Sequence, residues 1–383
     1  MRATIAKIYI DNLRHNLKSI RARISKDSKM CVAVKADAYG HGAVRCAQEA
    51  ISCGADFLAV ATVEEGTELR EAGISVPILV LSLCDLEEIS ELVSNNLTPL
   101  VFDPEYIQKI EECVRSQNKS NFAVHLAVDT GMGRIGCLPE NAVSIAKIID
   151  SSDVLRLGGM CTHFAAADSI KEEDIAYTEQ QFAAFLHAVD SVKTAGINPG
   201  IRHCANSALT LARPEMHLDM CRPGIIAYGY YPGDITAEYL QSIGLGIELK
   251  PVMALVSKIA AIRPFVAGKS ISYGHTWTAQ KPTDIGVLTI GYGDGMFRRF
   301  SQAGVKIAVN GKEYPICGRI CMDQCMIDLG ANSSVPRWSE AIIFGPKESG
   351  ALQSAQEIAD ATGTISYEIT CGISKRVQRV FIG

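Results

Sequence analysis

Residues 31–44 read CVAVKADAYGHGAV, and this stretch decides the fold class. It begins with apolar and β-branched residues of the kind that form a buried strand. Lys35 then stands where another apolar side chain would fit, and Asp37, Tyr39 and two glycines follow closely. A helix-compatible segment, residues 43–54, comes next. The stretch therefore predicts a buried strand that ends in polar, reactive side chains and leads into a helix.

The same alternation of strand and helix recurs up to about residue 230. Short apolar runs are separated by segments that carry apolar residues at helical spacing and end at Gly or Asn. Eight strands that alternate with helices predict a parallel sheet closed into an α/β barrel, the (β/α)8 or TIM type. An open, doubly wound sheet is the structural alternative. The predicted strands are residues 30–37, 57–62, 78–82, 98–102, 122–129, 156–164, 201–207 and 221–229.

Helices are predicted between several of these strands and before the first one. Residues 11–24 place Leu13, Leu17 and Ile20 on one face, which is typical of a helix that packs against a core. The other predicted helices of this part are residues 43–54, 62–73, 85–96 and 177–196.

The sequence pattern changes after about residue 240. Apolar runs are now separated by turn residues, and VNGKEY (309–314) places Asn-Gly between two alternating runs, a strong hairpin signal. One further helix is predicted over residues 354–363. We therefore expect two domains, a barrel over residues 1–240 and a mostly β domain over residues 241–383.

Composition excludes several classes of protein. Hydrophobic residues make up 48% of the 383 residues and charged residues 21%, as in a globular protein, and the formal net charge is −5. This charge and the absence of a basic cluster argue against a nucleic-acid partner. No apolar run approaches the ~20 residues that a membrane crossing needs, and no apolar segment of signal-peptide length begins the chain. We expect a cytoplasmic protein.

The thirteen cysteines are scattered, often within apolar strands. This distribution favours reduced thiols that pack in a core. The stretches CGRIC and CMDQC do not have the spacing of the usual paired-cysteine metal sites, so we expect no metal.

Polar side chains recur where the predicted strands end, which in a barrel is where reactive groups lie. They are Lys35, Arg134, His163, Ser207 and Arg222. Taken singly, Lys35 is typical of a salt-bridged lysine and His163 of a hydrogen-bonded core histidine. Together they indicate a site. Burial lowers the pKa of a lysine, and a neutral amine is what an aldehyde cofactor needs to form a Schiff base.

Several motifs of the sequence resemble those of the alanine racemase family. VAVKADAYGHG looks like the lysine motif that binds pyridoxal phosphate in that family. The likeness continues in order through DTGMGRIG, CTHFAAAD, HCANSAL, CRPGIIAYG, ISYGHTW, GYGDG, GRICMDQ and ISYEITCGISKRV, and so covers both expected domains. The resemblance implies an isomerase that interconverts L- and D-alanine and supplies D-alanine for peptidoglycan.

The resemblance also implies how pyridoxal phosphate is bound. Lys35 would form the Schiff base, His163 would lie near the pyridine ring, and Arg222 would donate to the ring nitrogen. Because arginine does not pass a proton to pyridine, the ring nitrogen would stay neutral, which disfavours transamination. The residues implied for the phosphate group are Tyr39, Ser207, Gly224, Ile225 and Tyr367.

Inversion needs a proton taken from one face of a planar intermediate and returned to the other, so two bases are expected. The resemblance implies Lys35 on one face and Tyr273 of a neighbouring subunit on the other, which requires a homodimer. Arg134 and the backbone N–H of Met322 would hold the substrate carboxylate. Arg319 and Arg298 are candidates for the cation that favours a phenolate.

One position departs from the family. Members often carry a carbamylated lysine two residues before the Asp of DTGMGR, which orients the substrate-binding arginine. This chain has Ala127 there, so no carbamate can form and the support for Arg134 stays open.

Three alternatives remain. The first is a racemase of the same fold that prefers serine or accepts a broader range of amino acids. The second is a non-catalytic carrier of pyridoxal phosphate, although such proteins resemble only the first half of this chain. The third is a decarboxylase with a barrel and a β domain, which we would expect to differ at Arg222 and in ISYGHTW.

Overall fold

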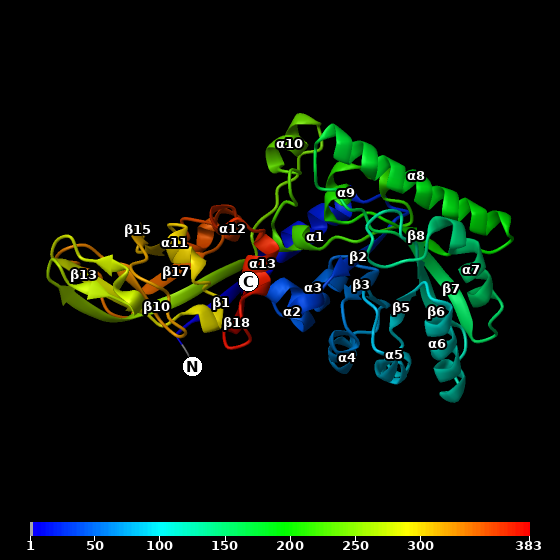
Figure 1. The fold of residues 1–383 in the computed structure, drawn as a ribbon, viewed down its shortest axis with the longest axis horizontal. Coiled ribbons are helices and arrows are strands. Elements are labelled where there is room, and N and C mark those ends of the chain that lie inside the picture. The colour runs from blue at the N-terminus through cyan, green and yellow to red at the C-terminus, as the bar shows by residue number, and fades with distance from the viewer. Residues whose placement is uncertain (1–2) are drawn as a thin grey trace.

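The protein consists of a parallel barrel and a second, mostly antiparallel sheet, shown in Figure 1 on the right and left. The computed structural model describes residues 3–383. The barrel strands are β2 (Lys29–Ala33), β3 (Phe57–Val60), β4 (Ile78–Val80), β5 (Thr98–Val101), β6 (Phe122–Ala127), β7 (Leu155–Cys161), β8 (Ile201–His203) and β9 (Met220–Cys221).

These eight strands lie in the order β8-β7-β6-β5-β4-β3-β2-β9, and each ladder between neighbours is parallel. Two backbone hydrogen bonds join the ends of this series. The N–H of Asp219 donates to the carbonyl of Arg202 (3.0 Å), and the N–H of Arg222 donates to that of Ala205 (2.8 Å). The predicted (β/α)8 barrel is confirmed, and the open doubly wound sheet is wrong.

Helices cover the outside of the barrel. Each predicted helix has a counterpart, although four further helices, α6, α7, α9 and α10, were not predicted. Asp103 caps α6 by accepting a hydrogen bond from the N–H of Tyr106 (2.9 Å), and Pro104 stands at its first position. The right-handed helices of this part are α1 (Ile10–Arg23), α3 (Ala43–Ser52), α4 (Val63–Glu71), α5 (Ile89–Ser94), α6 (Pro104–Ser116), α7 (Ala142–Asp150), α8 (Glu172–Thr194), α9 (Ser207–Ala212) and α10 (Ala237–Ser242). The segment α2 (Lys35–Gly40) is left-handed over residues 36–39.

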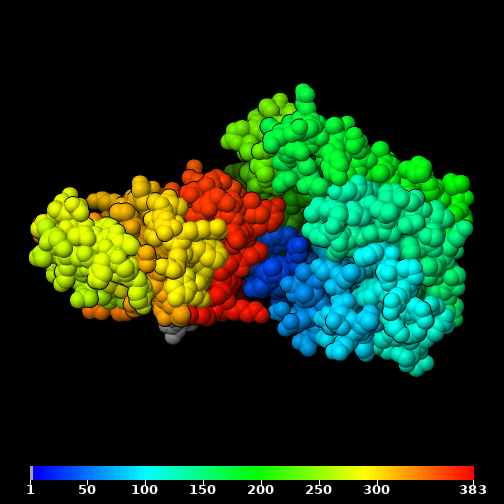
Figure 2. Space-filling model, viewed as in Figure 1, coloured from blue at the N-terminus to red at the C-terminus, as the bar shows by residue number. Residues whose placement is uncertain are grey.

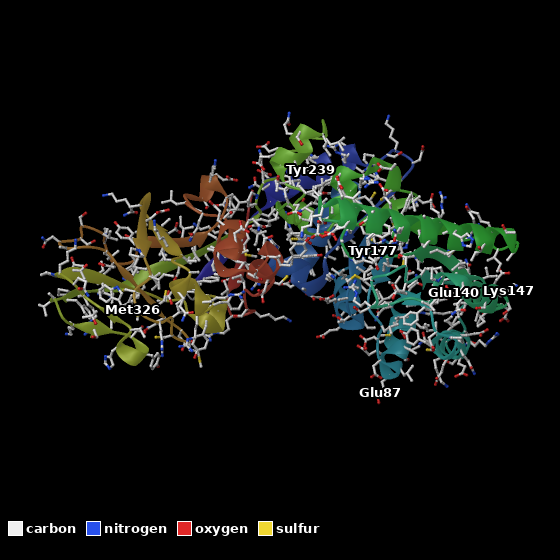
Figure 3. The ribbon with its side chains drawn as sticks, turned by 45° about the horizontal axis from the view of Figure 1, so that its top comes forward. Glu87, Glu140, Lys147, Tyr177, Tyr239 and Met326 are labelled. Carbon is white, nitrogen blue, oxygen red and sulfur yellow. The ribbon has the colours of Figure 1, made fainter. Side chains whose placement is uncertain are left out.

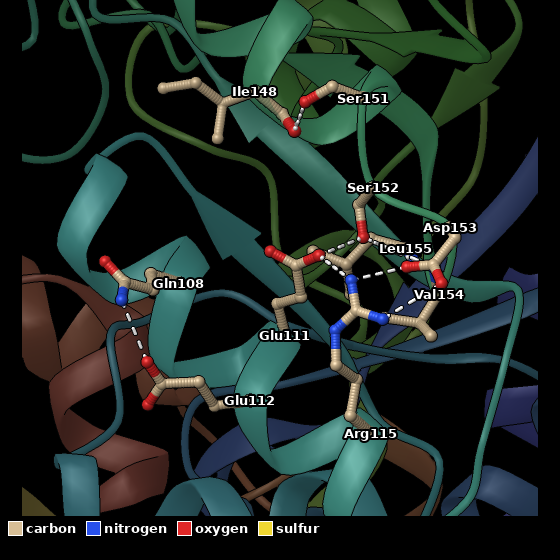
Figure 4. A network of polar contacts seen from close by, with 10 residues as sticks. All are labelled: Gln108, Glu111, Glu112, Arg115, Ile148, Ser151, Ser152, Asp153, Val154 and Leu155. Carbon is tan, nitrogen blue, oxygen red and sulfur yellow. Dashed lines mark hydrogen bonds and ion pairs between the residues drawn. The ribbon is translucent and has the colours of Figure 1, made fainter.

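A polar network fixes α6 against the loop between α7 and β7 (Figure 4). Arg115 donates to Glu111 one turn earlier (2.7 Å) and to Asp153 in the loop (2.9 Å). Ser152 donates its hydroxyl to the same Glu111 carboxylate (2.8 Å). Since these groups are open to solvent, the network orients the helix and contributes little to stability.

The second sheet is built from both ends of the chain. The first strand, β1 (Ile5–Tyr9), lies between β10 (Met253–Phe265) and the last strand, β18 (Gln378–Ile382). The sheet therefore depends on the N-terminal strand as well as on the C-terminal part of the chain. Its other strands are β13 (Thr283–Leu288), β14 (Lys306–Val309), β15 (Lys312–Pro315), β16 (Cys325–Asp328) and β17 (Glu340–Phe344).

The predicted hairpin at Asn-Gly is confirmed. Strands β14 and β15 pair antiparallel, and Val309 lies opposite Lys312. Asn310 and Gly311 between them have φ angles of 49° and 75°. Two successive positive φ angles are what a tight turn needs to match the twist of the strands. The helix predicted over residues 354–363 is also confirmed, as α12 (Ala355–Thr362).

The C-terminal segment packs directly on the barrel. Figure 2 shows it in red against the blue N-terminal part of the barrel. Arg379 donates to the carbonyl of Gly40 (2.9 Å), and a Cβ at Gly40 would lie 2.2 Å from the carbonyl oxygen of Thr370. Residue 40 must therefore be glycine for the two parts to approach this closely. None of the helices between residues 3 and 383 has the length and apolar character that a membrane crossing needs.

Asn16 on α1 fixes the path of the chain from the barrel to the second sheet. Its side chain is fully buried and bonds three backbone groups. The amide donates to the carbonyls of Ala227 (3.1 Å) and Lys250 (2.8 Å), and the side-chain oxygen accepts from the N–H of Lys250 (2.8 Å).

We predict that Asn16→Ala lowers the free energy of unfolding by about 2–4 kcal/mol, because it leaves buried backbone groups without partners. Urea denaturation followed by circular dichroism measures this. The control is Asn141→Ala, at an exposed position whose side chain makes no capping hydrogen bond; it should change the value by less than about 0.5 kcal/mol. An equally small effect of Asn16→Ala would contradict the assignment.

Candidate active site

A cavity of about 590 Å³ opens where the chain leaves the barrel strands at their C-terminal ends. This is the end at which barrels of this type carry their active sites. The cavity brings together residues from the ends of β2, β6, β7, β8 and β9, and one tyrosine from α13 (Ser366–Cys371) near the C-terminus. Eight of the residues predicted from sequence line it: Lys35, Tyr39, Arg134, His163, Ser207, Arg222, Gly224 and Tyr367.

Lys35 is followed by a backbone conformation that is rare for residues other than glycine. Residues 36–39, here called the left-handed turn, have φ angles of 52–54°. Each such residue costs about 1–2 kcal/mol relative to a right-handed helix. The turn carries Tyr39 into the barrel core, where its side chain is buried. Contacts outside the turn must therefore hold it in place.

Three hydrogen bonds stabilise the C-terminal end of the left-handed turn. The Asp37 carboxylate accepts a hydrogen bond from the N–H of Ala43 (2.8 Å). The ring of His41 bonds the carbonyls of Ala38 and Tyr39 through Nδ1 (2.9 Å each). Because carbonyl oxygens only accept, His41 carries its proton on Nδ1. Burial lowers the pKa of His41 to about 4, so the ring is neutral.

The Lys35 amine lies in an environment that favours its neutral form. Burial lowers its pKa, and the positive charges of Arg134 and Arg222 act in the same direction. The Glu65 carboxylate opposes them. The expectation of a lysine with a lowered pKa at the end of the first barrel strand is confirmed.

One end of the cavity is lined by neutral hydrogen-bonding groups. Burial raises the pKa of the Tyr39 and Tyr367 phenols, which therefore stay protonated. Ser207 accepts a hydrogen bond from the N–H of Gly224 (2.9 Å). A Cβ at Gly224 would lie 2.6 Å from the Tyr39 hydroxyl, so glycine keeps this space open. Hydroxyl donors and an open backbone form a cradle for an anionic group such as a phosphate.

Arg222 also lines the cavity, is nearly buried and has no carboxylate partner among residues 3–383. It donates to the carbonyls of Thr162 (2.9 Å) and His203 (2.9 Å) and to Nδ1 of His203 (2.8 Å). The guanidinium is thus held entirely by neutral acceptors. It retains its positive charge, since arginine does not lose its proton in proteins.

A chain of two further histidines supports Arg222. Because Nδ1 of His203 accepts from Arg222, its proton lies on Nε2, which donates to Nδ1 of His125 (2.8 Å). Burial lowers the pKa of His125 to about 3 and that of His203 well below its usual range, so both rings are neutral. The sequence did not mark these histidines as functional, because His125 stands inside an apolar strand and His203 ends a short one, where each is typical of a hydrogen-bonded core histidine.

His163 lines the cavity next to Arg222, and its ring is neutral. Burial lowers its pKa to about 3, with further contributions from the charges of Arg222, Arg134 and Lys35. A neutral, flat ring suits contact with an aromatic ligand and does not act as an acid at neutral pH.

Arg134 stands on an exposed loop, and the residues described here provide no hydrogen bond or ion pair to its guanidinium. The loop itself is ordered. Asp129 accepts from the N–H groups of Gly131 (2.9 Å) and Gly133 (3.1 Å). Tyr177, which Figure 3 labels on α8, donates its hydroxyl to the carbonyl of Gly131 (2.9 Å). Ala127 is buried and lines the cavity below the loop.

Gln181 on α8 connects the loops that carry Arg134 and His163. It is buried, accepts from the N–H of Ala165 (3.1 Å) and donates to the hydroxyl of Thr130 (3.5 Å). Tyr177 and Gln181 were not identified from sequence, where residues 177–196 indicated only an outer helix.

Three predicted site residues lie outside the cavity. Ile225 is fully buried beside Gly224. Tyr273 lies between β11 (Ser270–Ile271) and β12 (Trp277–Thr278), which form a separate two-stranded sheet, and 68% of its surface is exposed. Met322 lies in the loop between β15 and β16, with 52% of its surface exposed. A Cβ at Gly274 would lie 3.0 Å from Nη1 of Arg319, so this arginine lies beside the residue that follows Tyr273.

Comparison with known proteins identifies the family. Residues 8–232 match the family model of the alanine racemase N-terminal domain, and residues 252–381 match that of the C-terminal domain. The chain belongs to the alanine racemase family. Its members are isomerases, and the family was correctly predicted from the motifs of the sequence.

Full-length relatives support this assignment. The chain is 49% identical to an alanine racemase of Treponema denticola over 100% of this chain and 99% of the relative. It is 43% identical to that of Treponema pallidum, over 98% of each chain. A solved alanine racemase of Clostridium difficile 630 has a TM-score of 0.91 at 38% identity and covers 100% of this chain and 96% of its own. That of Bacillus anthracis with bound L-Ala-P has a TM-score of 0.91 at 35% identity, with the same coverage.

We predict that stability falls as the pH drops from about 6.5 towards 4. The unfolded chain binds protons at His41, His125, His163 and His203 in this range, whereas the folded chain does not, so each contributes a loss of about 1.4 kcal/mol per pH unit. Urea denaturation at a series of pH values measures the slope. His125→Gln should make it shallower, and exposed His187→Gln should not. A stability that is constant from pH 7 to pH 5 would contradict the neutral histidines.

Proposed function

We propose that this protein is an alanine racemase that interconverts L- and D-alanine with pyridoxal phosphate as its cofactor. The observation that carries the proposal is the composition of the cavity. It combines Lys35, whose amine has a lowered pKa, with Arg222, which has no carboxylate partner, and with a cradle of neutral phenols. Family membership supports the same reaction.

The residues of the cavity fit pyridoxal phosphate. The open space at Gly224, with the hydroxyls around it, suits the phosphate group. Arg222 would donate a hydrogen bond to the ring nitrogen without giving it a proton. When bound, the cofactor attaches to an amine through its aldehyde and delocalises the electron pair left by removal of an α-proton. The residues proposed to hold it are Lys35, Tyr39, His163, Ser207, Arg222, Gly224, Ile225 and Tyr367.

Lys35 is proposed to move the proton on one face of the substrate. Its lowered pKa keeps a fraction of the amine neutral and able to accept a proton from the α-carbon. Arg134 lines the same cavity and is proposed to bind the substrate carboxylate, as guanidinium groups do with planar oxyanions. The backbone N–H of Met322 is proposed as a second donor to that carboxylate.

Tyr273 is proposed to serve the opposite face from the second subunit of a homodimer. Within one chain the cavity contains Lys35 but not Tyr273, whose side chain is 68% exposed. An exposed phenol on one subunit and a cavity with one base on the other are complementary. The dimer would therefore complete the site, and a monomer would lack a base.

We further propose a cytoplasmic location and a use of D-alanine in peptidoglycan. The thirteen cysteines are all free thiols in the structure, which suits a reducing compartment. We also propose that the chain divides near residue 240 into a barrel, residues 1–240, and a β domain, residues 241–383. In this division β1 pairs with the strands of the second domain.

We predict that Lys35→Ala removes both the visible absorbance of bound cofactor and at least about a thousandfold of the racemisation rate. Optical rotation of L-alanine and, separately, of L-serine measures activity and substrate preference. Lys29→Ala, an exposed lysine at the opposite end of β2, is the matched control and should behave like the wild type. Wild-type protein that racemises neither amino acid with added cofactor would refute the proposal.

We predict that Lys35→Ala and Tyr273→Phe chains, each inactive alone, recover activity when they are mixed and allowed to exchange subunits. Random exchange yields one intact site per mixed dimer, and therefore about a quarter of the wild-type activity. In the control, the dimers of each variant are cross-linked separately before the two variants are mixed, so that their subunits cannot exchange. No recovery, with exchange verified by mass spectrometry, would show that Tyr273 does not act across subunits.

A further inference from the structure

We propose that Glu65, on α4, is a positioning residue for Lys35, because its carboxylate accepts a hydrogen bond from the peptide that follows the lysine and brings a negative charge into the surroundings of the amine. The proposal rests on the function assigned above to Lys35. Glu65 does not line the cavity, and the sequence indicated only a residue at the start of an outer helix.

The Glu65 carboxylate joins the ends of two neighbouring barrel strands. One oxygen accepts a hydrogen bond from the N–H of Ala36 (2.6 Å), the first residue of the left-handed turn. The other accepts from the N–H of Ala61 (2.7 Å), just after β3. Both bonds are short and charge-assisted, the stronger class of hydrogen bond.

This arrangement differs from ordinary helix capping. Thr62 caps α4 by accepting from the N–H of Glu65 (3.2 Å), and a glutamate at this third position usually bonds back to the N–H of the capping residue itself. Here the glutamate instead reaches Ala61 and, on the adjacent strand, Ala36. A residue that only capped α4 would not need to bond Ala36 on the adjacent strand.

The hydrogen bond from the N–H of Ala36 to Glu65 stabilises the N-terminal end of the left-handed turn. The hydrogen bonds of the Asp37, His41 and Arg379 side chains are made to backbone groups within residues 37–43. A backbone bond from the N–H of Ala38 to the carbonyl of Val34 (2.8 Å) spans the start of the turn, and Glu65 adds a side-chain bond to the peptide that joins Lys35 to it. Without the Glu65 bond, the strained φ angle at Ala36 (52°) loses one of its restraints, and so does the position of the lysine Cα.

Glu65 also determines the balance of charge around the Lys35 amine. The charged or titratable groups that act on the amine are Arg134 and Arg222, which lower its pKa, and Glu65 and Cys371, which raise it. Burial raises the pKa of the Cys371 thiol, so it is neutral at pH 7. His163 is neutral as well. Glu65 is thus the one anion among these groups, and its loss should lower the pKa of Lys35 further.

We predict that Glu65→Gln, in the full-length holoenzyme, has two effects that a cap alone would not produce together. If Lys35 accepts the α-proton of D-alanine and Tyr273 that of L-alanine, the acid limb of the pH profile of kcat for D-alanine should move down by about one unit, because Lys35 loses its anionic neighbour. Hydrogen exchange of the peptide amides at residues 35–37 should become at least about tenfold faster, because a glutamine amide cannot accept from both N–H groups.

Two further variants sharpen the test. Glu357→Gln removes the same charge from the equivalent position of α12, where Glu357 bonds Ser354 in a closed capping box, and should change neither readout. Glu65→Asp keeps the charge but shortens the side chain, so it should restore the acid limb while exchange stays fast.

If Glu65→Gln speeds hydrogen exchange but leaves the acid limb of the pH profile of kcat unchanged, Glu65 has only a structural role and the proposal is overturned. Unchanged hydrogen exchange in Glu65→Gln would overturn it as well. The function proposed for Lys35 fails separately, if Lys35→Ala remains active. In that case the acid limb of the wild type does not report on Lys35 at all.

Discussion

The left-handed turn after Lys35 is the constraint on which the site depends. Four successive residues with φ angles near 53° are unfavourable, and the chain adopts them because its neighbours bind the turn from several sides. The turn stops β2 at the rim of the barrel and carries Tyr39 back into the core. Glu65 holds its beginning and Arg379, from the C-terminal strand, contacts its end at Gly40. Barrel, helix layer and second sheet thus meet at one short stretch.

Three basic side chains determine the chemistry of the cavity, which is also lined by the carboxylates of Asp129 and Asp168. Lys35, Arg134 and Arg222 face one space, and the described residues offer Arg222 no carboxylate. Their mutual repulsion adds to burial in lowering the pKa of Lys35 and of His163. Such a cavity favours an anionic ligand and a neutral amine at the same time, which are the requirements of a cofactor with a phosphate group and an aldehyde.

Much of the fold and of the cavity followed from sequence, for physical reasons. Eight apolar runs separated by helical periodicity leave few alternatives to a barrel, and polar residues at strand ends such as Lys35 and Arg222 must then converge. Glu65, Tyr177 and His203 were not identified as functional. Their roles depend on neighbours far away in sequence, and each is ordinary in its own segment: a helix-start acid, a helix-surface tyrosine and a strand histidine. The left-handed turn was also missed, because three of its four residues are alanine or tyrosine, which do not favour positive φ, and a single aspartate is a weak signal.

The central claim is that the amine at the end of β2, held by this turn, is the one that binds the cofactor covalently. Borohydride reduction of the purified protein, followed by proteolysis and mass spectrometry, tests it most directly. The account predicts one phosphopyridoxyl group per chain, located on Lys35 within the peptide that contains residues 31–44. A modification at any other lysine, or none on a chain that racemises alanine, would contradict it.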